Sequence, residues 1–243
     1  MKQVFLVVFG LLFFSIFGTS CLVWTIVVLG RNEYLTAVAV FGFAALCFGF
    51  VALFIKVRLG AITARVTYEP TGTTLRPDRG AVLLGGIAVV GGEVAMGLGA
   101  VLAFFGRLDV PLGPGQRLDR LVGMGAVGAL LGVPTMWRMF TRGTYLRLTP
   151  TGFEASQGWP SAAGEWVEVK DVTDHAPGRR AVTARGIVIV MSDGRTPTLA
   201  TGMFTPDGRA LRELVWFYWQ HPEFRSELTD GRALERLNKQ RFE

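Results

Sequence analysis

One acidic side chain stands deep inside a long apolar run. Glu93 lies near the middle of the run 81–105, far from either end. An ionisable group at that depth in a membrane is costly unless it is neutral, paired or hydrated. No basic residue falls inside an apolar run to neutralise it, so a neighbouring hydroxyl such as Thr19 or Ser20 is left as a hydrogen-bond partner. Glu93 therefore serves as an interhelical hydrogen-bonding group, as part of a proton or ion path, or as a partner-subunit contact. The first role is favoured.

Small residues are the second feature of the apolar runs. Gly128 and Gly132 form a small-xxx-small pair, which lets two helix backbones approach closely. This pair packs either within the protein's own helix bundle or against another subunit, and packing within the bundle is favoured. The doublets Gly85-Gly86 and Gly91-Gly92 lack the strand and Gly-Lys-Ser/Thr sequence of a phosphate-binding loop.

Recognisable catalytic and metal-binding patterns are absent from the sequence. There is no Gly-x-Ser-x-Gly, His-Glu-x-x-His, dinucleotide fingerprint or Walker loop. Asp171, Asp174 and His175 have no Ser or Cys nucleophile nearby and are interpreted as a solvated strand end. Two isolated cysteines and two separated histidines do not form a metal cluster. We predict no catalytic residues, no metal and no cofactor.

Four long apolar runs occupy the N-terminal half of the chain. A helix needs about 20 apolar residues to cross a hydrocarbon core of about 30 Å. Three runs reach that length and the fourth approaches it, which predicts four transmembrane helices in residues 1–142. The runs are Val4–Leu29, Leu35–Ile55, Ala81–Phe105 and Leu121–Trp137.

The distribution of charge predicts the topology and excludes a nucleic-acid partner. The formal net charge is +6, yet residues 143–243 contain 13 basic and 13 acidic residues, so the whole excess belongs to residues 1–142. Lys2, the 56–80 connection and the residues after the fourth run carry nine basic residues, against four in the other two connections. The positive-inside bias predicts a multi-pass protein of the cell membrane with both termini in the cytoplasm.

Two polar segments share a turn pattern. Alternating residues at 64–69 meet Pro70-Thr71-Gly72 before a second extended stretch, which predicts a short cytoplasmic β-hairpin at 62–78. The pattern returns after the fourth run as a strand, Pro150-Thr151-Gly152 and another strand. The repetition indicates an internal duplication or a coincidence of three residues.

The remaining residues predict a β-rich domain, 143–221, and we expect residues 143–243 to fold independently. Alternation over Gly164–Val172 predicts one strand, with Trp166 in the core, followed by strands at Ala181–Arg185, Gly186–Met191 and Thr196–Ala200. A closing helix with Thr205 as N-cap and Pro206 as its first residue has apolar positions at helical spacing. These positions are Leu211, Leu214, Val215 and Tyr218. Residues 222–243 are predicted to form an amphipathic helical tail that is divided near Asp230-Gly231.

The order of these elements resembles the bacterial pleckstrin-homology-like (PH-like) domains attached to membrane spans in actinobacterial conserved membrane proteins. The resemblance covers about residues 143–221 and rests on Leu148–Phe153 and Glu165–Val172. It implies a cytoplasmic β domain closed by an α-helix. PH domains that bind phosphoinositides carry clustered basic residues around the first hairpin, where this chain has only Arg147. The resemblance therefore does not imply inositol-lipid binding.

A patterned domain without a reactive centre favours a non-enzymatic accessory or scaffold subunit. Its expected partners are the lipid bilayer and another membrane protein or complex, with no nucleic acid. A transporter component that uses Glu93 is the alternative, and a membrane enzyme of unrecognised type is the third hypothesis.

Overall fold

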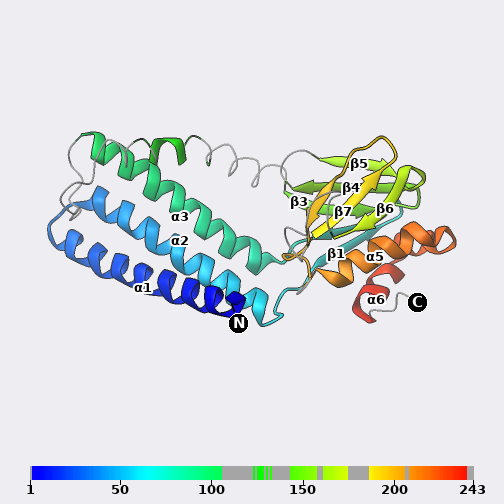
Figure 1. The fold of residues 1–243 in the computed structure, drawn as a ribbon, viewed down its shortest axis with the longest axis horizontal. Helices are drawn as coiled ribbons and strands as arrows, with labels where there is room; N and C mark the ends of the chain where they lie inside the picture. Colours follow the sequence, from blue (N-terminus) through cyan, green and yellow to red (C-terminus); the bar gives the residue numbers. More distant parts are fainter. Residues whose placement is uncertain are drawn as a thin grey trace. The chain divides into compact units, whose positions relative to one another are not determined.

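The computed structural model divides the chain into two compact units (Figure 1). The first unit comprises Met1–Ile55 with Leu83–Trp137, and the second comprises Lys56–Val82 with Arg138–Glu243. The residues that the structure describes are 2–105, 123, 125–128, 130, 132, 143–157, 161–174, 186–205 and 208–239.

Long apolar helices form the described part of the first unit. They are α1 (Lys2–Gly30), α2 (Tyr34–Arg58) and α3 (Arg79–Phe104). By length and composition, three segments within them can cross a membrane: Phe5–Gly30, Tyr34–Arg58 and Arg79–Phe104. The chain is therefore a membrane protein by its helices. The predicted fourth span, Leu121–Trp137, lies largely outside the described residues, although the residues described within it are helical.

Small residues let α2 and α3 approach closely. A Cβ atom added to Gly42 would lie 2.5 Å from the carbonyl oxygen of Gly91 and 3.0 Å from the backbone nitrogen of Ala95. Seven residues further along, which is about two helical turns, a Cβ on Gly49 would lie 2.9 Å from the backbone nitrogen of Ala88. All three distances are shorter than ordinary van der Waals contact. Glycine is therefore required at these two positions for the observed helix packing.

The first helix is less buried than the other two, with 11% of its span buried against 33% for α2 and for α3. Its contact with α2 includes Cys21 against Val40 and Ala44, and the rings of Phe14 and Phe50 lie 5.2 Å apart. A row of exposed phenylalanines spaced four residues apart covers the rest of α1. The row contains Phe5, Phe9, Phe13 and Phe17. Such an apolar surface is compatible with contact to lipid.

Two antiparallel sheets make up most of the second unit. The five-stranded sheet has the order β1-β2-β3-β4-β5, and the three-stranded sheet has the order β6-β7-β8. The strands are β1 (Arg65–Glu69), β2 (Gly72–Arg76), β3 (Thr144–Leu148), β4 (Gly152–Gln157), β5 (Ala162–Glu165), β6 (Val169–Thr173), β7 (Gly186–Met191) and β8 (Thr198–Ala200). The predicted strand Ala181–Arg185 lies outside the described residues.

The hairpin predicted at 62–78 belongs to the β domain rather than to the membrane region. Strand β2 pairs with β3, so that Leu75 lies opposite Leu146. The side chain of Leu75 is fully buried in the core of the second unit. The expected boundary at residue 142 is therefore corrected. A fragment beginning at 143 would lack two of the five strands of its larger sheet.

The two Pro-Thr-Gly turns lie at the same end of this sheet. Strands β1 and β3 run in the same direction, and each ends in one of the turns. The guanidinium of Arg147 donates a hydrogen bond to the Thr71 hydroxyl (2.7 Å), which links one hairpin to the turn of the other. Gly72 has a φ of +147°, and a Cβ there would overlap the carbonyl oxygen of Leu148. The similar turns therefore serve equivalent, neighbouring hairpins.

The single strand predicted over Gly164–Val172 is wrong. Strand β5 ends at Glu165, a 3-10 turn η1 occupies Trp166–Glu168, and β6 continues in the other sheet. The apolar side chains do not keep strict alternation, because Trp166 and Val167 are adjacent. Trp166 is buried whereas Val167 is 85% exposed. The turn thus carries the chain from one sheet to the next, and the register shifts between Val169 and Asp171.

The closing helix starts later than predicted. Helix α5 (Arg209–Gln220) has Gly208 as its N-cap, with a left-handed φ of 74° that favours glycine. Thr205 therefore does not cap it, and Pro206 lies outside the described residues. The tail forms a 3-10 helix, η2 (Pro222–Thr229), and a short helix, α6 (Arg232–Lys239). Its apolar residues Leu228, Ala233 and Leu237 are buried in the domain core.

Replacing Trp166 with alanine should destabilise the second unit by about 3–5 kcal/mol, because a large buried aromatic side chain is removed from the core. Trp216 is 41% exposed on α5 and supplies the matched control. Thermal unfolding of the full-length variants, followed by circular dichroism, should show a lowered midpoint for Trp166→Ala. An equal effect of Trp216→Ala would contradict the assignment of Trp166 to the core.

Candidate functional site

The carboxyl group of Glu93 meets Gly132 in the first unit. A Cβ atom added to Gly132 would overlap the Glu93 carboxylate. One carboxylate oxygen, Oε2, is buried and has no hydrogen-bond partner among the residues that the structure describes. Two residues that the sequence singled out separately therefore form one site, and glycine at 132 leaves room for the acidic side chain.

Three glycines bring the fourth helical segment against α3. A Cβ on Gly125 would lie 2.9 Å from the carbonyl oxygen of Met96, and one on Gly128 would lie 2.8 Å from the Met96 sulfur. Gly125, Gly128 and Gly132 are spaced by three and four residues, so they share one helix face. They contact α3 in the reverse order of its sequence, because Gly125 also faces Ala100. The two helical segments are therefore antiparallel.

The two hydroxyl groups that the sequence suggested as partners of Glu93 bind elsewhere. Thr19 and Ser20 donate to backbone carbonyls of their own helix, at 2.8 and 3.0 Å. The other charged residues described in this unit are Lys2, Arg31 and Glu33, at the ends of helices. An ionisable side chain in the middle of an apolar helix is costly unless it is paired or hydrated.

In the second unit, the predicted core residues are all buried. Trp166 is 2% exposed, and its indole Nε1 donates to the carbonyl oxygen of Thr149 at 2.8 Å. The guanidinium of Arg225 lies 5.3 Å from the centre of the Trp166 ring. Leu211, Leu214 and Tyr218 are at most 1% exposed. These residues hold the sheets and α5 together.

A buried polar network ties the tail to α5. Arg236 donates two hydrogen bonds to the Glu227 carboxylate, at 2.8 and 2.9 Å, and the Tyr218 hydroxyl donates a third at 3.2 Å. Burial opposes the negative charge of Glu227, but Arg236 outweighs it and lowers the pKa of that carboxyl. Burial, followed by the charge of Glu227, raises the pKa of Tyr218. Because two hydrogen bonds join Arg236 to Glu227, this ion pair fixes the relative orientation of the two side chains and has a structural role.

Asp78 is the most highly connected acid of the hairpin segment. Its carboxylate accepts hydrogen bonds from the backbone N–H of Ala81 (2.7 Å) and the hydroxyl of Thr63 (3.3 Å). The ammonium of Lys56 lies 3.1 Å away. Burial opposes its charge, but the Ala81 N–H and Lys56 outweigh it and lower the pKa of Asp78. Asp78 therefore caps α3 and holds the end of α2 beside it.

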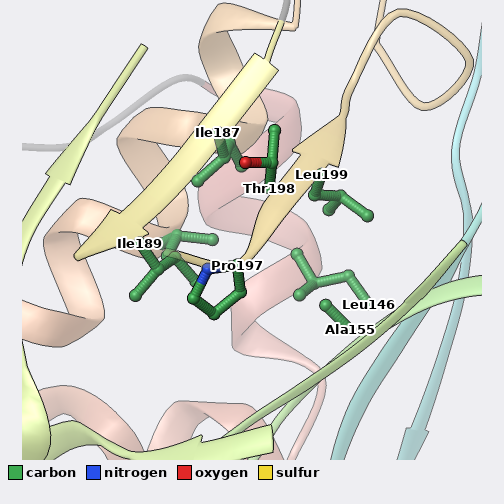
Figure 2. A pocket seen from close by; sticks show the side chains of 8 residues that line it. Leu146, Ala155, Ile187, Ile189, Pro197, Thr198 and Leu199 are labelled. Atoms are coloured by element: carbon green, nitrogen blue, oxygen red, sulfur yellow. The ribbon is translucent and has the colours of Figure 1, made fainter. Parts of the chain in front are cut away.

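An apolar cavity lies between the two sheets of the second unit (Figure 2). Its volume of about 10 Å³ is close to the smallest that holds one water. Side chains from both sheets and from α5 line it, among them Leu146, Ile187, Leu199 and Val215. The cavity is a gap in core packing and is too small for a metabolite.

The acids and histidines suggested by sequence do not assemble into a reactive centre in the described structure. Among the described residues, no group of three metal-ligating side chains is present. Asp171 accepts the backbone N–H of Val172, and Asp174 lies 3.1 Å from Arg212. His221 lies 3.2 Å from Glu223 at the surface, while His175 is outside the described residues. Comparisons with protein-family models, curated proteins and solved structures gave no match.

Alanine at position 132 should destabilise the first unit by about 1–3 kcal/mol, because its methyl group would displace the Glu93 carboxylate. Gly123→Ala is the matched control, since a Cβ there meets nothing within 4 Å. Thermal unfolding of the detergent-purified chain measures both variants. The double variant Gly132→Ala, Glu93→Ala should recover part of the loss. If it recovers none, the two residues do not share a site.

Proposed function

We propose that this protein is a non-enzymatic accessory or scaffold subunit of the cell membrane, whose β domain docks another membrane protein. The main support is that three acids in the described part of the second unit have structural partners. Asp78 caps a helix, Glu227 pairs with Arg236, and Asp174 pairs with Arg212. The apolar cavity between the sheets has a volume of only about 10 Å³.

The proposal includes four membrane spans, and the pairing of β2 with β3 supports the fourth. These strands share one sheet, so they lie on the same side of the membrane. Helix α3 follows β2 and is long and apolar enough to cross. If α3 crosses once, the chain must cross again before β3 begins at Thr144. The run Leu121–Trp137 is the apolar segment available for that return.

The proposed orientation has both termini and the β domain in the cytoplasm. Basic residues are concentrated in Lys2, the 56–80 connection and the segment after the fourth run. Positively charged connections are retained on the cytoplasmic side. An even number of spans then returns the C-terminus to the side of the N-terminus.

Reporter fusions measure this topology directly. A fusion after Glu243 should show cytoplasmic activity, and one inserted within 111–116 should show activity on the opposite side. A fusion in the turn at Thr71 serves as the internal control, since the hairpin must report the same side as the C-terminus. An extracellular C-terminus would contradict the proposed orientation, and reporters on different sides at Thr71 and Glu243 would contradict the shared sheet.

We further propose that the second unit is a PH-like domain. Two antiparallel sheets joined at the Trp166 turn, with α5 packed into their core, support this relationship. In this chain, however, the first two strands precede the third span, so the domain is interrupted by membrane helices. Arg147, the basic residue of the second hairpin, is engaged by Thr71 and lies 3.8 Å from Glu69. A phosphoinositide site in that hairpin is therefore not part of the proposal.

A transporter component remains the second candidate because one oxygen of Glu93 is buried without a partner. The two functions differ in how they use this carboxyl group. A relay must titrate, whereas an interhelical hydrogen bond needs only a polar side chain. Glutamine preserves the hydrogen bonding and removes the titration.

Two measurements on the full chain separate these functions. For the scaffold, a photo-cross-linking amino acid at Val167, an apolar residue 85% exposed on the turn η1, should capture one membrane protein reproducibly. The exposed polar position Thr198 is the control and should give less product. In reconstituted vesicles, Glu93→Gln should leave ion flux unchanged. Loss of a measurable flux in a folded Glu93→Gln protein, together with no cross-linked partner, would favour the transporter.

A further inference from the structure

Like charges face each other at the base of the first hairpin. Arg65, the first residue of β1, lies directly opposite Arg76, the last residue of β2, so both project from the same face of the sheet. The Nε of Arg65 donates a hydrogen bond to the carbonyl oxygen of Pro77 at 3.1 Å, which fixes its guanidinium at this end. Two like charges at directly opposed positions repel, and an anion would relieve that repulsion.

The neighbouring helix ends add to this positive charge. Arg79 is the first residue of α3, and the first turn of that helix contains no acidic residue. A cation at a helix N-terminus is unfavourable because the helix dipole is positive there. Arg58 ends α2, two residues after Lys56. The basic residues of the hairpin and of the two helix ends therefore lie at the base of the hairpin, which is the end away from its turn.

The acidic residues of the segment do not neutralise this end. Residues 56–80 contain five basic residues and two acidic ones, Glu69 and Asp78. Glu69 belongs to the far end of the hairpin, where it faces Arg147. Asp78 is already bound by Lys56 and caps α3. Arg76 and Arg79 are exposed, and neither makes an ion pair with any residue that the structure describes.

Chain continuity places these residues next to the apolar spans. The apolar part of α2 ends at Ile55, just before Lys56, and that of α3 begins at Ala81, just after Arg79. Leu59, beside Arg58, is 76% exposed. Basic side chains and a projecting apolar residue at the end of a span suit the headgroup layer of a bilayer.

We propose that Arg65, Arg76 and Arg79, with Arg58 at the end of α2, form a binding surface for the phosphate groups of anionic phospholipids. The planar guanidinium groups suit phosphate oxygens, and a bound headgroup would offset both the Arg65–Arg76 repulsion and the charge at the α3 N-terminus. This surface is at the opposite end of the hairpin from the Pro-Thr-Gly turn. The inference rests on the proposed function, in which α2 and α3 are inserted in the membrane. It identifies the class of lipid that the protein binds there.

The test uses the detergent-purified full chain and native mass spectrometry. Phosphatidylglycerol should bind more tightly than phosphatidylcholine, and added salt should weaken its binding because the contact is electrostatic. The double variant Arg76→Gln, Arg79→Gln should reduce phosphatidylglycerol affinity about 25-fold, since each basic residue near an anionic membrane surface contributes roughly a factor of five. Its melting temperature should not fall, as neither side chain makes an ion pair with a described residue and the variant relieves the repulsion between Arg65 and Arg76.

A charge-matched control removes two positive charges elsewhere in the second unit. The double variant Arg232→Gln, Lys239→Gln changes two exposed residues near the C-terminus and should leave phosphatidylglycerol affinity within twofold of the original protein. Equal binding of both lipids, or equal loss in the two double variants, would overturn the inference. Displacement of the lipid by inorganic phosphate beyond that by chloride of the same ionic strength would show a free-phosphate site and would also overturn it.

The lipid result and the proposed scaffold function are separable. Cross-linking from Val167 reports on the docked protein, whereas the Arg76→Gln, Arg79→Gln variant reports on the headgroup surface. Cross-linking that persists while the original protein shows no preference for phosphatidylglycerol would overturn only the lipid surface. A lipid preference that depends on Arg76 and Arg79, without a cross-linked partner, supports the lipid surface and contradicts the scaffold.

Discussion

The backbone pairing of β2 with β3 is the constraint on which the second unit depends. It joins a hairpin placed before α3 to a strand placed after the fourth apolar run, and it buries Leu75 beside Leu146. Without it the larger sheet would divide into a two-stranded hairpin and a three-stranded remainder. An isolated two-stranded hairpin is marginally stable at best in water. The hairpin and the C-terminal residues therefore form one cooperative structure.

Several polar contacts described in this unit join its helices and its tail. Asp78 joins the ends of α2 and α3, and its backbone N–H also donates to the carbonyl oxygen of Met203 at 2.9 Å. The Glu227–Arg236 pair holds the tail, while Arg225 donates to the carbonyl oxygens of Tyr218 and Trp219 at the end of α5. Each of these contacts offsets part of the free energy lost when the charged group is removed from water. Breaking one of them would leave the buried charge incompletely compensated.

Long apolar runs and helical spacing were sufficient to predict α1, α2, α3 and the buried face of α5. Strand boundaries were harder to predict from the sequence. The adjacent apolar pair Trp166-Val167 breaks the alternation, whereas the residues on either side preserve it. The assignment of the hairpin failed for a different reason, since pairing between strands separated by residues 77–143 leaves no local trace in the sequence. Glu93 and Gly132 were each visible in the sequence. Their contact depends on the antiparallel order of two helices, which local sequence does not specify.

The position of α3 and of the fourth apolar run between β2 and β3 also sets an order for biogenesis. Once the ribosome has released the first hairpin, β2 has a partner on one side only, and its other edge displays unpaired N–H and C=O groups. The partner strand emerges only after the intervening helices have been synthesised. The sheet is therefore assembled late. Slow membrane insertion would lengthen the time for which the unpaired edge of β2 can pair with a strand of another chain. The short length of β2, only five residues, limits that hazard.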